Sequence, residues 1–249
     1  MGTYKPLDAS KLTRDKKRDA LKSLLFITEK RDGRVKSKKC AIASKQRTYD
    51  GYDKCAGSFP TVTTKGLIMT CAIDAHQEQD NAIVDVGHAF LHADNDKNIL
   101  VKLRGKIVEL PVQLEPVMYR KYVTTGPNGE PILYVRLLKA LYGLLRSALL
   151  FYKKLRADLE NMGSEVNPYD PCVANNVINW LQMTVTWHVN DVKISHKESD
   201  DITNFITELG KLYDNDLAVH QGKVHSYLGM LFYYSTKGTV KISMLTLRK

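Results

Sequence analysis

The chain has 249 residues, 43% of them hydrophobic, which is enough for a sizeable core in one large domain or two smaller ones. It contains no run of about 18 apolar residues, because Lys139 and Arg146 interrupt its most apolar stretch (137–151), so we expect no transmembrane helix. The net charge is +10, and residues 1–50 hold 15 Lys and Arg against 6 Asp and Glu. This basic region indicates either a polyanionic partner, with nucleic acid as the first candidate, or a solvated basic helix.

The cysteines and histidines give no pattern typical of a metal site. Cys40, Cys55, Cys71 and Cys172 are widely spaced without a CxxC, and the seven histidines form no HExxH and no pair at metal-ligand spacing. We therefore expect free thiols and structural or surface histidines. The N-terminus lacks the apolar segment of a signal peptide, so we expect a cytosolic or nuclear protein.

The first half of the chain predicts two helices, a hairpin and two strands. Residues 13–26 have the pattern of a short basic helix capped by Thr13, and Arg31–Arg34 is turn chemistry between two extended arms. Apolar residues at helical spacing predict a helix over 61–78. Residues 82–86 form a short apolar run around a lone Asp85, typical of a buried strand, and residues 99–105 read as another strand.

The second half is dominated by a long helical pattern and two hairpins. Apolar residues keep a period of about 3.6 over 138–162, and Gly163 follows as a cap. Residues 183–196 alternate as a hairpin with Asn190 and Asp191 as its two-residue loop. Ser199 is placed to cap a further helix, and residues 225–244 predict a second hairpin. This irregular mixture predicts an α+β fold with an antiparallel sheet, and neither GxGxxG nor Walker A occurs.

Two acidic residues stand out as candidates for chemistry. Asp85 interrupts an apolar strand, and Asp191 lies at a hairpin tip. Two carboxylates brought together from separate strands make an oxygen-ligand site suited to Mg²⁺, and two such ions support phosphoryl transfer. The alternative is that Asp85 is only a surface or salt-bridged strand residue.

Five segments, in matching order, resemble the reverse transcriptase of copia-type LTR retrotransposons. They cover motifs of the types K-x-R, D-V-x-x-A-F-L, L-Y-G-L, Y-V-D-D and F-L-G, and the likeness extends over about residues 10–249. The segments are EKRDGRVKSKKCAIASKQR (29–47), VDVGHAFLHAD (84–94), LLKALYGLLRSALLFYKKL (137–155), WHVND (187–191) and YLGM (227–230).

The resemblance implies a right-hand polymerase with fingers and palm, an antiparallel palm sheet and packed helices. It implies DNA synthesis from dNTPs on an RNA or DNA template-primer with two Mg²⁺ ions, for which Mn²⁺ can substitute. The location would be cytoplasmic, in the particle of the element, or nuclear, with no membrane partner. The implied segments are basic fingers with an N-terminal helix (1–80), palm (81–98), fingers return (99–137), palm with helix 138–162 and hairpin 183–196 (138–235), and the start of a thumb (236–249).

The resemblance also assigns roles to individual residues. Asp85, Asp191 and Val86 match the metal-binding positions, and the catalytic positions are Asp85, Asn190 and Asp191. Nucleotide-binding positions are Lys36 and Lys38 for the triphosphate, Phe90 for the sugar and Gly143 for close backbone approach; contacts to nucleic acid fall on Arg34, Lys45 and Arg47. Lys38 replaces the usual Arg, so bidentate phosphate recognition is lost while the charge remains. The alternatives are a core aromatic at Phe90, ordinary exposed lysines, and an accidental glycine within a helical pattern at Gly143.

The sequence departs from the family at the hairpin tip, where Asn190 stands in place of the first Asp. An amide oxygen is a weaker, neutral metal ligand, and losing roughly 4 kcal/mol of metal stabilisation would slow chemistry about a thousandfold. His188, Ser164, Arg146 and Ala148 also depart from the family pattern. We therefore expect an impaired polymerase; the alternatives are a non-catalytic nucleic-acid-binding remnant and an unrelated basic α+β protein.

Overall fold

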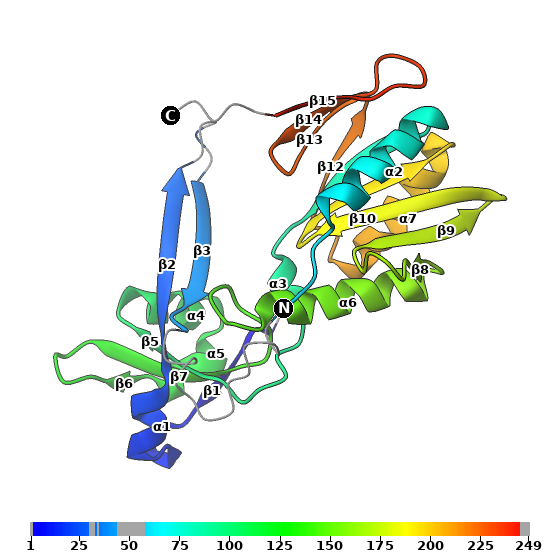
Figure 1. Ribbon diagram of the computed structural model, residues 1–249. Helices are drawn as coiled ribbons and strands as arrows, with labels where there is room; N and C mark the ends of the chain where they lie inside the picture. Colours follow the sequence, from blue (N-terminus) through cyan, green and yellow to red (C-terminus); the bar gives the residue numbers. More distant parts are fainter. Residues whose placement is uncertain (1, 30–32, 34, 44–57, 245–249) are drawn as a thin grey trace. The chain divides into compact units, whose positions relative to one another are not determined.

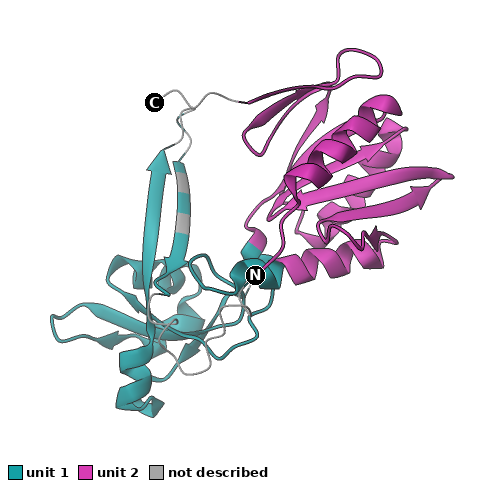
Figure 2. Cartoon of the chain, viewed as in Figure 1, with its two compact units in different colours: residues 1–58, 90–151 teal, residues 59–89, 152–249 magenta. Residues whose placement is uncertain are grey.

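The computed structural model describes residues 2–29, 33, 35–43 and 58–244 as a mixed α/β structure with largely antiparallel sheets. The chain folds as two compact units (Figure 2), unit 1 from residues 1–58 and 90–151 and unit 2 from residues 59–89 and 152–249. The predicted division into fingers, palm and thumb segments, with boundaries near residues 80, 98, 137 and 235, stays a prediction. Within the described residues, no helix combines the length and apolar character needed to cross a membrane.

Unit 1 is built on one sheet with the strand order β1-β7-β5-β2-β3, to which the short β6 adds on β7 (Figure 1). The pairings are antiparallel except for the parallel contact between β2 and β5. Its elements are β1 (Tyr4–Leu7), α1 (Arg14–Asp19), β2 (Leu21–Glu29), β3 (Val35–Ala41), α3 (Ala89–His92, whose first residue belongs to unit 2), β5 (Leu100–Arg104), α4 (Lys106–Leu114), α5 (Pro116–Tyr119), β6 (Thr124–Thr125) and β7 (Pro131–Leu137).

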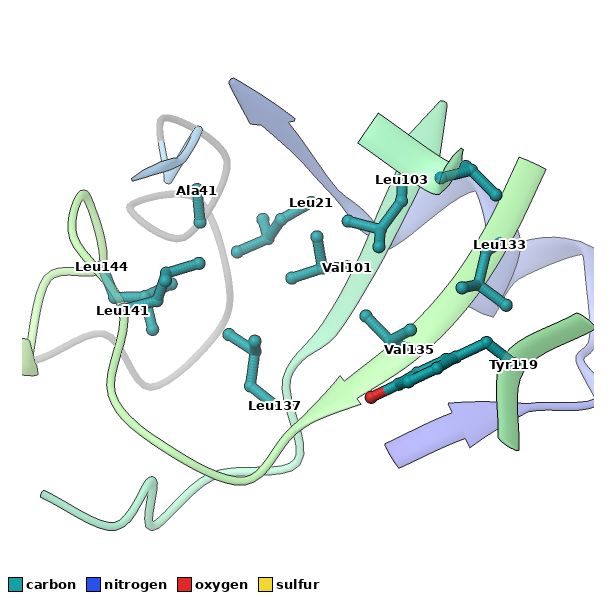
Figure 3. Close-up of a cluster of buried hydrophobic side chains, with 11 residues drawn as sticks. Leu21, Ala41, Val101, Leu103, Tyr119, Leu133, Val135, Leu137, Leu141 and Leu144 are labelled. Atoms are coloured by element: carbon teal, nitrogen blue, oxygen red, sulfur yellow. The ribbon is translucent and has the colours of Figure 1, made fainter. Parts of the chain in front are cut away.

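The core of unit 1 gathers on the middle strands of this sheet. Figure 3 shows side chains of β2, β5 and β7 directed toward one another, together with leucines from the segment after β7. Alternate residues of β7 enter this core because side chains of a strand point to opposite faces. The buried members are Leu21, Ala41, Val101, Leu103, Val108, Tyr119, Leu133, Val135, Leu137, Leu141 and Leu144.

The predicted helix over 13–26 is wrong in its second half. Thr13 caps α1 as expected, its side chain accepting a hydrogen bond from the Lys16 amide, but the helix ends at Asp19. Residues 21–29 instead form β2, which pairs with β3 and confirms the predicted hairpin arms. The apolar residues of this segment are compatible with a strand as well as with a helix, and pairing with β3 favours the strand. The turn at 31–34 lies outside the described residues except for Gly33.

Unit 2 contains a sheet with the strand order β12-β4-β11-β10-β9-β8 and a smaller sheet, β13-β14-β15. All of these pairings are antiparallel. The elements are α2 (Thr64–His76), β4 (Asp80–Val86), α6 (Ser147–Asn161, whose first turn belongs to unit 1), β8 (Glu165–Val166), β9 (Val173–Ile178), β10 (Leu181–His188), β11 (Asp191–His196), α7 (Ser199–Leu212), β12 (Leu217–Gly222), β13 (Val224–Tyr227), β14 (Met230–Tyr233) and β15 (Lys241–Met244).

Helices cover both faces of the larger sheet. Lys193 of β11 forms a buried ion pair with Asp74 of α2, so α2 covers the face on which Lys193 and Asp191 lie. Trp187 of β10, paired in register with Val192, stacks on Tyr152 of α6 with ring centroids 6.3 Å apart. The part of α6 that belongs to unit 2 therefore packs on the opposite face.

The predicted helix over 138–162 begins later than expected, at Ser147. Residues 141–146 are not helical: Leu144 N–H donates to the Leu141 carbonyl at 3.2 Å, and the hydroxyl of Ser147, at the start of α6, donates to the same oxygen at 2.6 Å. Leu141 contributed to the predicted helical period, but it enters the core of unit 1 from these turns, together with Leu144. The predicted end is confirmed, because α6 stops at Asn161 and Gly163 has φ +88°.

The other predicted elements are mostly confirmed. The helix over 61–78 and the strands over 82–86 and 99–105 correspond to α2, β4 and β5. Ser199 is the first helical residue of α7 and not its cap, since Glu198 occupies the cap position without a side-chain bond. The second hairpin is a three-stranded sheet. Among the described cysteines, Cys40, Cys71 and Cys172 are free, and Cys55 lies outside the description.

The buried ion pair predicts a large loss of stability when one partner is removed. Lys193 and Asp74 are only 3% and 1% exposed, so Asp74→Ala leaves an ammonium group buried without its carboxylate. We expect urea unfolding to show a loss of about 3–5 kcal/mol, and the double variant Asp74→Leu with Lys193→Met to recover most of it. In the exposed pair Lys211–Glu208, Glu208→Ala should cost less than about 1 kcal/mol. Equal losses in the two single variants would contradict this role.

Candidate functional site

The two predicted acidic residues meet on neighbouring strands of unit 2. β4 and β11 pair antiparallel with Asp85 directly opposite Asp191, and Ile83 opposite Lys193. Residues directly opposite in an antiparallel pair carry side chains on the same face. The sheet therefore brings together two carboxylates that are distant in sequence. Asp85 is exposed, while its neighbours Val84 and Val86 are fully buried, so its strand is a core strand but its carboxylate is not buried.

The turn between β10 and β11 differs from the predicted one. His188 pairs with Asp191, so the two-residue loop is Val189–Asn190 and Asp191 is the first residue of β11. Val189 has φ +57°. A β-branched residue in the left-handed region is strained by about 1–3 kcal/mol and is held there only by surrounding structure. Part of that support is the hydrogen bond from the Val86 amide to the Asn190 carbonyl, at 2.9 Å.

The Asn190 side chain faces β4 through its amide nitrogen. Nδ2 donates a hydrogen bond to Oδ1 of Asp85 and lies 3.4 Å from the Val86 carbonyl oxygen. Both neighbours are acceptors only, and this fixes the orientation of the amide with NH₂ toward them. The side chain therefore places two N–H groups at the oxygens where the resemblance implies a metal ion.

Asp191 lies in a partly buried and negatively charged environment. Burial, and then the charge of Asp85, raise the pKa of its carboxyl group, while His188 lowers it to a smaller extent. Its backbone carbonyl accepts a 3.1 Å hydrogen bond from the Tyr227 hydroxyl, which joins β13 to the first residue of β11. The position of Asp191 is thus supported from the smaller sheet as well as from β4.

With the Asn190 amide in this orientation, the site offers two carboxylates and opposes a cation beside Asp85. Mg²⁺ takes oxygen ligands, of which Asp85 and Asp191 supply two carboxylates. Asn190, however, directs hydrogen-bond donors at Asp85 and at the Val86 carbonyl. In the part of the chain that the structure describes, no group of three or more His, Cys, Asp or Glu side chains is placed to hold a metal ion. The arrangement is a pair of carboxylates, one of which, Asp85, accepts a hydrogen bond from the Asn190 amide.

Gly143 and the strand of the two predicted phosphate-binding lysines meet in unit 1. Gly143 has φ +88°, and a Cβ atom there would lie 2.2 Å from the Ala41 carbonyl oxygen. The Ala41 amide also donates to the Tyr142 carbonyl at 2.8 Å. A glycine is therefore needed for this segment to pass against the end of β3, and it does not lie within a helix. The backbone of Lys36 and Lys38 belongs to β3; their side chains lie outside the description.

The remaining predicted residues are placed less completely. Phe90 lies on α3, half-buried, with its ring 4.5 Å from that of Tyr142 and 6.3 Å from that of Phe151. These contacts support a packing role for Phe90 in unit 1. Arg34, Lys45 and Arg47 lie outside the described residues.

Sequence reasoning missed three residues that support the acidic pair. Tyr227 was noted only as part of a motif, and its hydrogen bond to Asp191 joins segments far apart in sequence. Lys193 shares the face of Asp191 two residues further along β11, and Asp74 on α2 neutralises it. Lys193 within an apolar strand indicated that a buried charge needs a partner, but no local pattern identified Asp74 as that partner.

No protein-family model and no curated protein matches the sequence. Solved structures similar to it include telomerase from Candida albicans in complex with a fragment of telomeric RNA, with TM-score 0.45, 9% identity, and coverage of 96% of this chain and 48% of that chain. Another is the Prototype Foamy Virus protease-reverse transcriptase, with TM-score 0.44, 13% identity, and coverage of 98% and 24%. The chain thus spans about half and about a quarter of these proteins. At these TM-scores the likeness by itself assigns neither fold nor function.

The raised pKa of Asp191 predicts that its charge destabilises the folded state at neutral pH. Because the folded state holds this proton more tightly than the unfolded state, the penalty exists above the raised pKa and disappears as pH falls to the usual value of 3.8. Asp191→Asn should raise the melting temperature by about 1–2 °C at pH 7 and leave it unchanged near pH 3.5. Glu165→Gln, at an exposed site, is the control. A rise in melting temperature that does not vary with pH would show that the charge of Asp191 is not its cause.

Proposed function

We propose that the chain is the RNA-directed DNA polymerase domain of a copia-type retrotransposon, with nucleotidyl transfer impaired by Asn190. Its substrates would be dNTPs and an RNA or DNA template-primer. The cofactor would be Mg²⁺, or Mn²⁺ in its place, and the location the cytoplasm or the nucleus. The proposal rests on the motifs of the resemblance together with one geometric observation, the direct pairing of Asp85 with Asp191.

The pairing of these strands supports the proposal because the two motifs were assigned independently. The segment VDV supplies Asp85 and the segment WHVND supplies Asp191, and the strands that carry them pair in register. An unrelated α+β protein would have no reason to bring these two positions together. The close approach of Gly143 to the end of β3, which carries Lys36 and Lys38, links two further motifs within unit 1.

Impairment follows from the chemistry of the Asn190 amide. A carboxylate at this position would add a negative charge and two acceptor oxygens beside Asp85. The amide instead donates to Asp85 and faces the Val86 carbonyl. Asn190 thus has two effects, a missing carboxylate ligand and an added hydrogen bond that occupies Asp85.

Primer extension on poly(rA)–oligo(dT) with Mg²⁺ or Mn²⁺ tests the proposal. We expect Asn190→Asp to extend the primer about a thousandfold faster than the natural chain. Asn190→Ala separates the two effects, because it frees Asp85 without supplying a carboxylate, and we expect it to remain slow. The double variant Asn190→Asp with Asp85→Asn should be inactive.

Two outcomes would contradict this account. If the natural chain extends the primer as fast as Asn190→Asp, Asn190 does not impair the site. If Asn190→Asp also fails while it binds template-primer, the polymerase proposal is wrong and a binding function remains.

A second candidate function is nucleic-acid binding without catalysis, favoured by the basic charge of the first 50 residues. Contacts between Lys or Arg and phosphates release counterions, so affinity must fall steeply with salt. Fluorescence anisotropy with a labelled template-primer should show a loss of affinity of at least about tenfold between 50 and 200 mM salt. A parallel titration with Asn190→Asp should give the same salt dependence. No binding at the lowest salt would rule out this function.

A further inference from the structure

Two histidines of unit 2 lie together where its two sheets join. His220 belongs to β12, in register with Ile83 of β4, and His225 belongs to β13, the first strand of the smaller sheet. The connection between them turns at Gly222, with φ +137°. His220 is exposed, whereas His225 is only 2% exposed. The pair therefore has one ligand atom held in the interior and one accessible from solvent.

The imidazole rings face each other through the same nitrogen. Nδ1 of His220 lies 3.3 Å from Nδ1 of His225, and the ring planes are 85° apart. On the other side of its ring, Nε2 of His225 lies 2.8 Å from the Gly222 carbonyl oxygen. That oxygen can only accept, so Nε2 carries the hydrogen and Nδ1 of His225 presents a bare lone pair to His220.

This arrangement matches half of a tetrahedral metal site. Two imidazole nitrogens bound at about 2.0–2.1 Å to one tetrahedral ion lie roughly 3.3 Å apart. A ligating histidine also typically donates its second ring N–H to a backbone carbonyl, as His225 does to Gly222.

We propose that His220 and His225 bind one borderline transition-metal ion, such as Zn²⁺ or Ni²⁺, with water completing its coordination. Without metal, Nδ1–H of His220 donates to Nδ1 of His225. On binding, that proton moves through solvent to the exposed Nε2 of His220, so both Nδ1 lone pairs face the ion and no net proton is released. The nearby cations are already compensated, since Lys193 pairs with Asp74 and Lys223 with Asp80.

The site would differ from the acidic pair in both ligand chemistry and effect. Imidazole nitrogens favour Zn²⁺ and Ni²⁺, whereas Mg²⁺ prefers oxygen ligands. A bound ion would link β12 to β13 across Gly222 and so fasten the smaller sheet to the larger one. Because the metal binds the folded state, it should stabilise unit 2 against unfolding.

The test uses the full chain without a histidine tag, stripped of metal and titrated with Zn²⁺ and Ni²⁺ by calorimetry. We expect saturable one-to-one binding, no heat with Mg²⁺ at the same concentrations, and a higher melting temperature with Zn²⁺. His220→Ala should weaken binding by more than tenfold, since even outer-shell partners are worth about 10–100-fold. His76→Ala, at an exposed helix position, should bind as the natural chain does.

Cobalt provides an independent measurement of the ligands. Co²⁺ bound to His220 and His225 should give weak visible absorption without a thiolate charge-transfer band, and His220→Ala should abolish it. Binding that His220→Ala leaves unchanged, a thiolate band that identifies cysteine ligands, or no one-to-one binding would each overturn the proposal. Because His220 is exposed, a folding defect in that variant is not expected, and its circular dichroism spectrum checks this.

Discussion

The antiparallel register between β4 and β11 is the constraint on which the rest of unit 2 depends. It places Asp85 opposite Asp191 and Ile83 opposite Lys193. A shift by one residue would turn every side chain of a strand to the other face, so Val192 and Ile194 would face α2 in place of Lys193. Lys193 would then be buried away from Asp74. The apolar residues of β11 and the buried ion pair thus select the same register.

Within that register, the charge at the hairpin tip depends on one atom of residue 190, which is an amide nitrogen where an aspartate would have an oxygen. Two carboxylates on one face repel each other, and the partly buried one is held closer to its neutral form. Asn190 relieves Asp85 by a hydrogen bond that a carboxylate in its place could not donate. The hairpin tip therefore offsets part of its own charge repulsion without a bound cation. A chain selected for cation-dependent chemistry at this point would leave that repulsion for the ion to neutralise.

Much of unit 2 could be predicted from sequence because its strands and helix α2 carry strong local patterns. Alternation along 183–196 gave the hairpin, and the run around Asp85 gave β4. The predicted loop, Asn190–Asp191, was wrong. Asn and Asp tolerate positive φ better than Val, so the sequence favoured them, but the pairing of His188 with Asp191 places Val189 in the loop. Residues 20–26 and 138–146 also had helical spacing, but β2–β3 pairing and burial of Leu141 and Leu144 in unit 1 prevailed.

The contacts Asp74–Lys193 and Tyr227–Asp191 join separate elements, so no local pattern could show them. The contact between His220 and His225 spans a turn that the predicted hairpin did not include.

The position of β3 has a consequence for solubility. Among the described strands of unit 1, β3 stands at the end of the strand order, and an edge strand offers unpaired backbone groups to any other chain. Its sequence, VKSKKCA, places three lysines on seven residues, and Tyr142 bridges to Cys40 near its end. Lysine on an edge strand opposes strand addition by a second molecule. By its sequence, β3 is therefore disfavoured as a partner for a strand of a second molecule, and replacing its lysines with neutral residues would make such pairing more favourable.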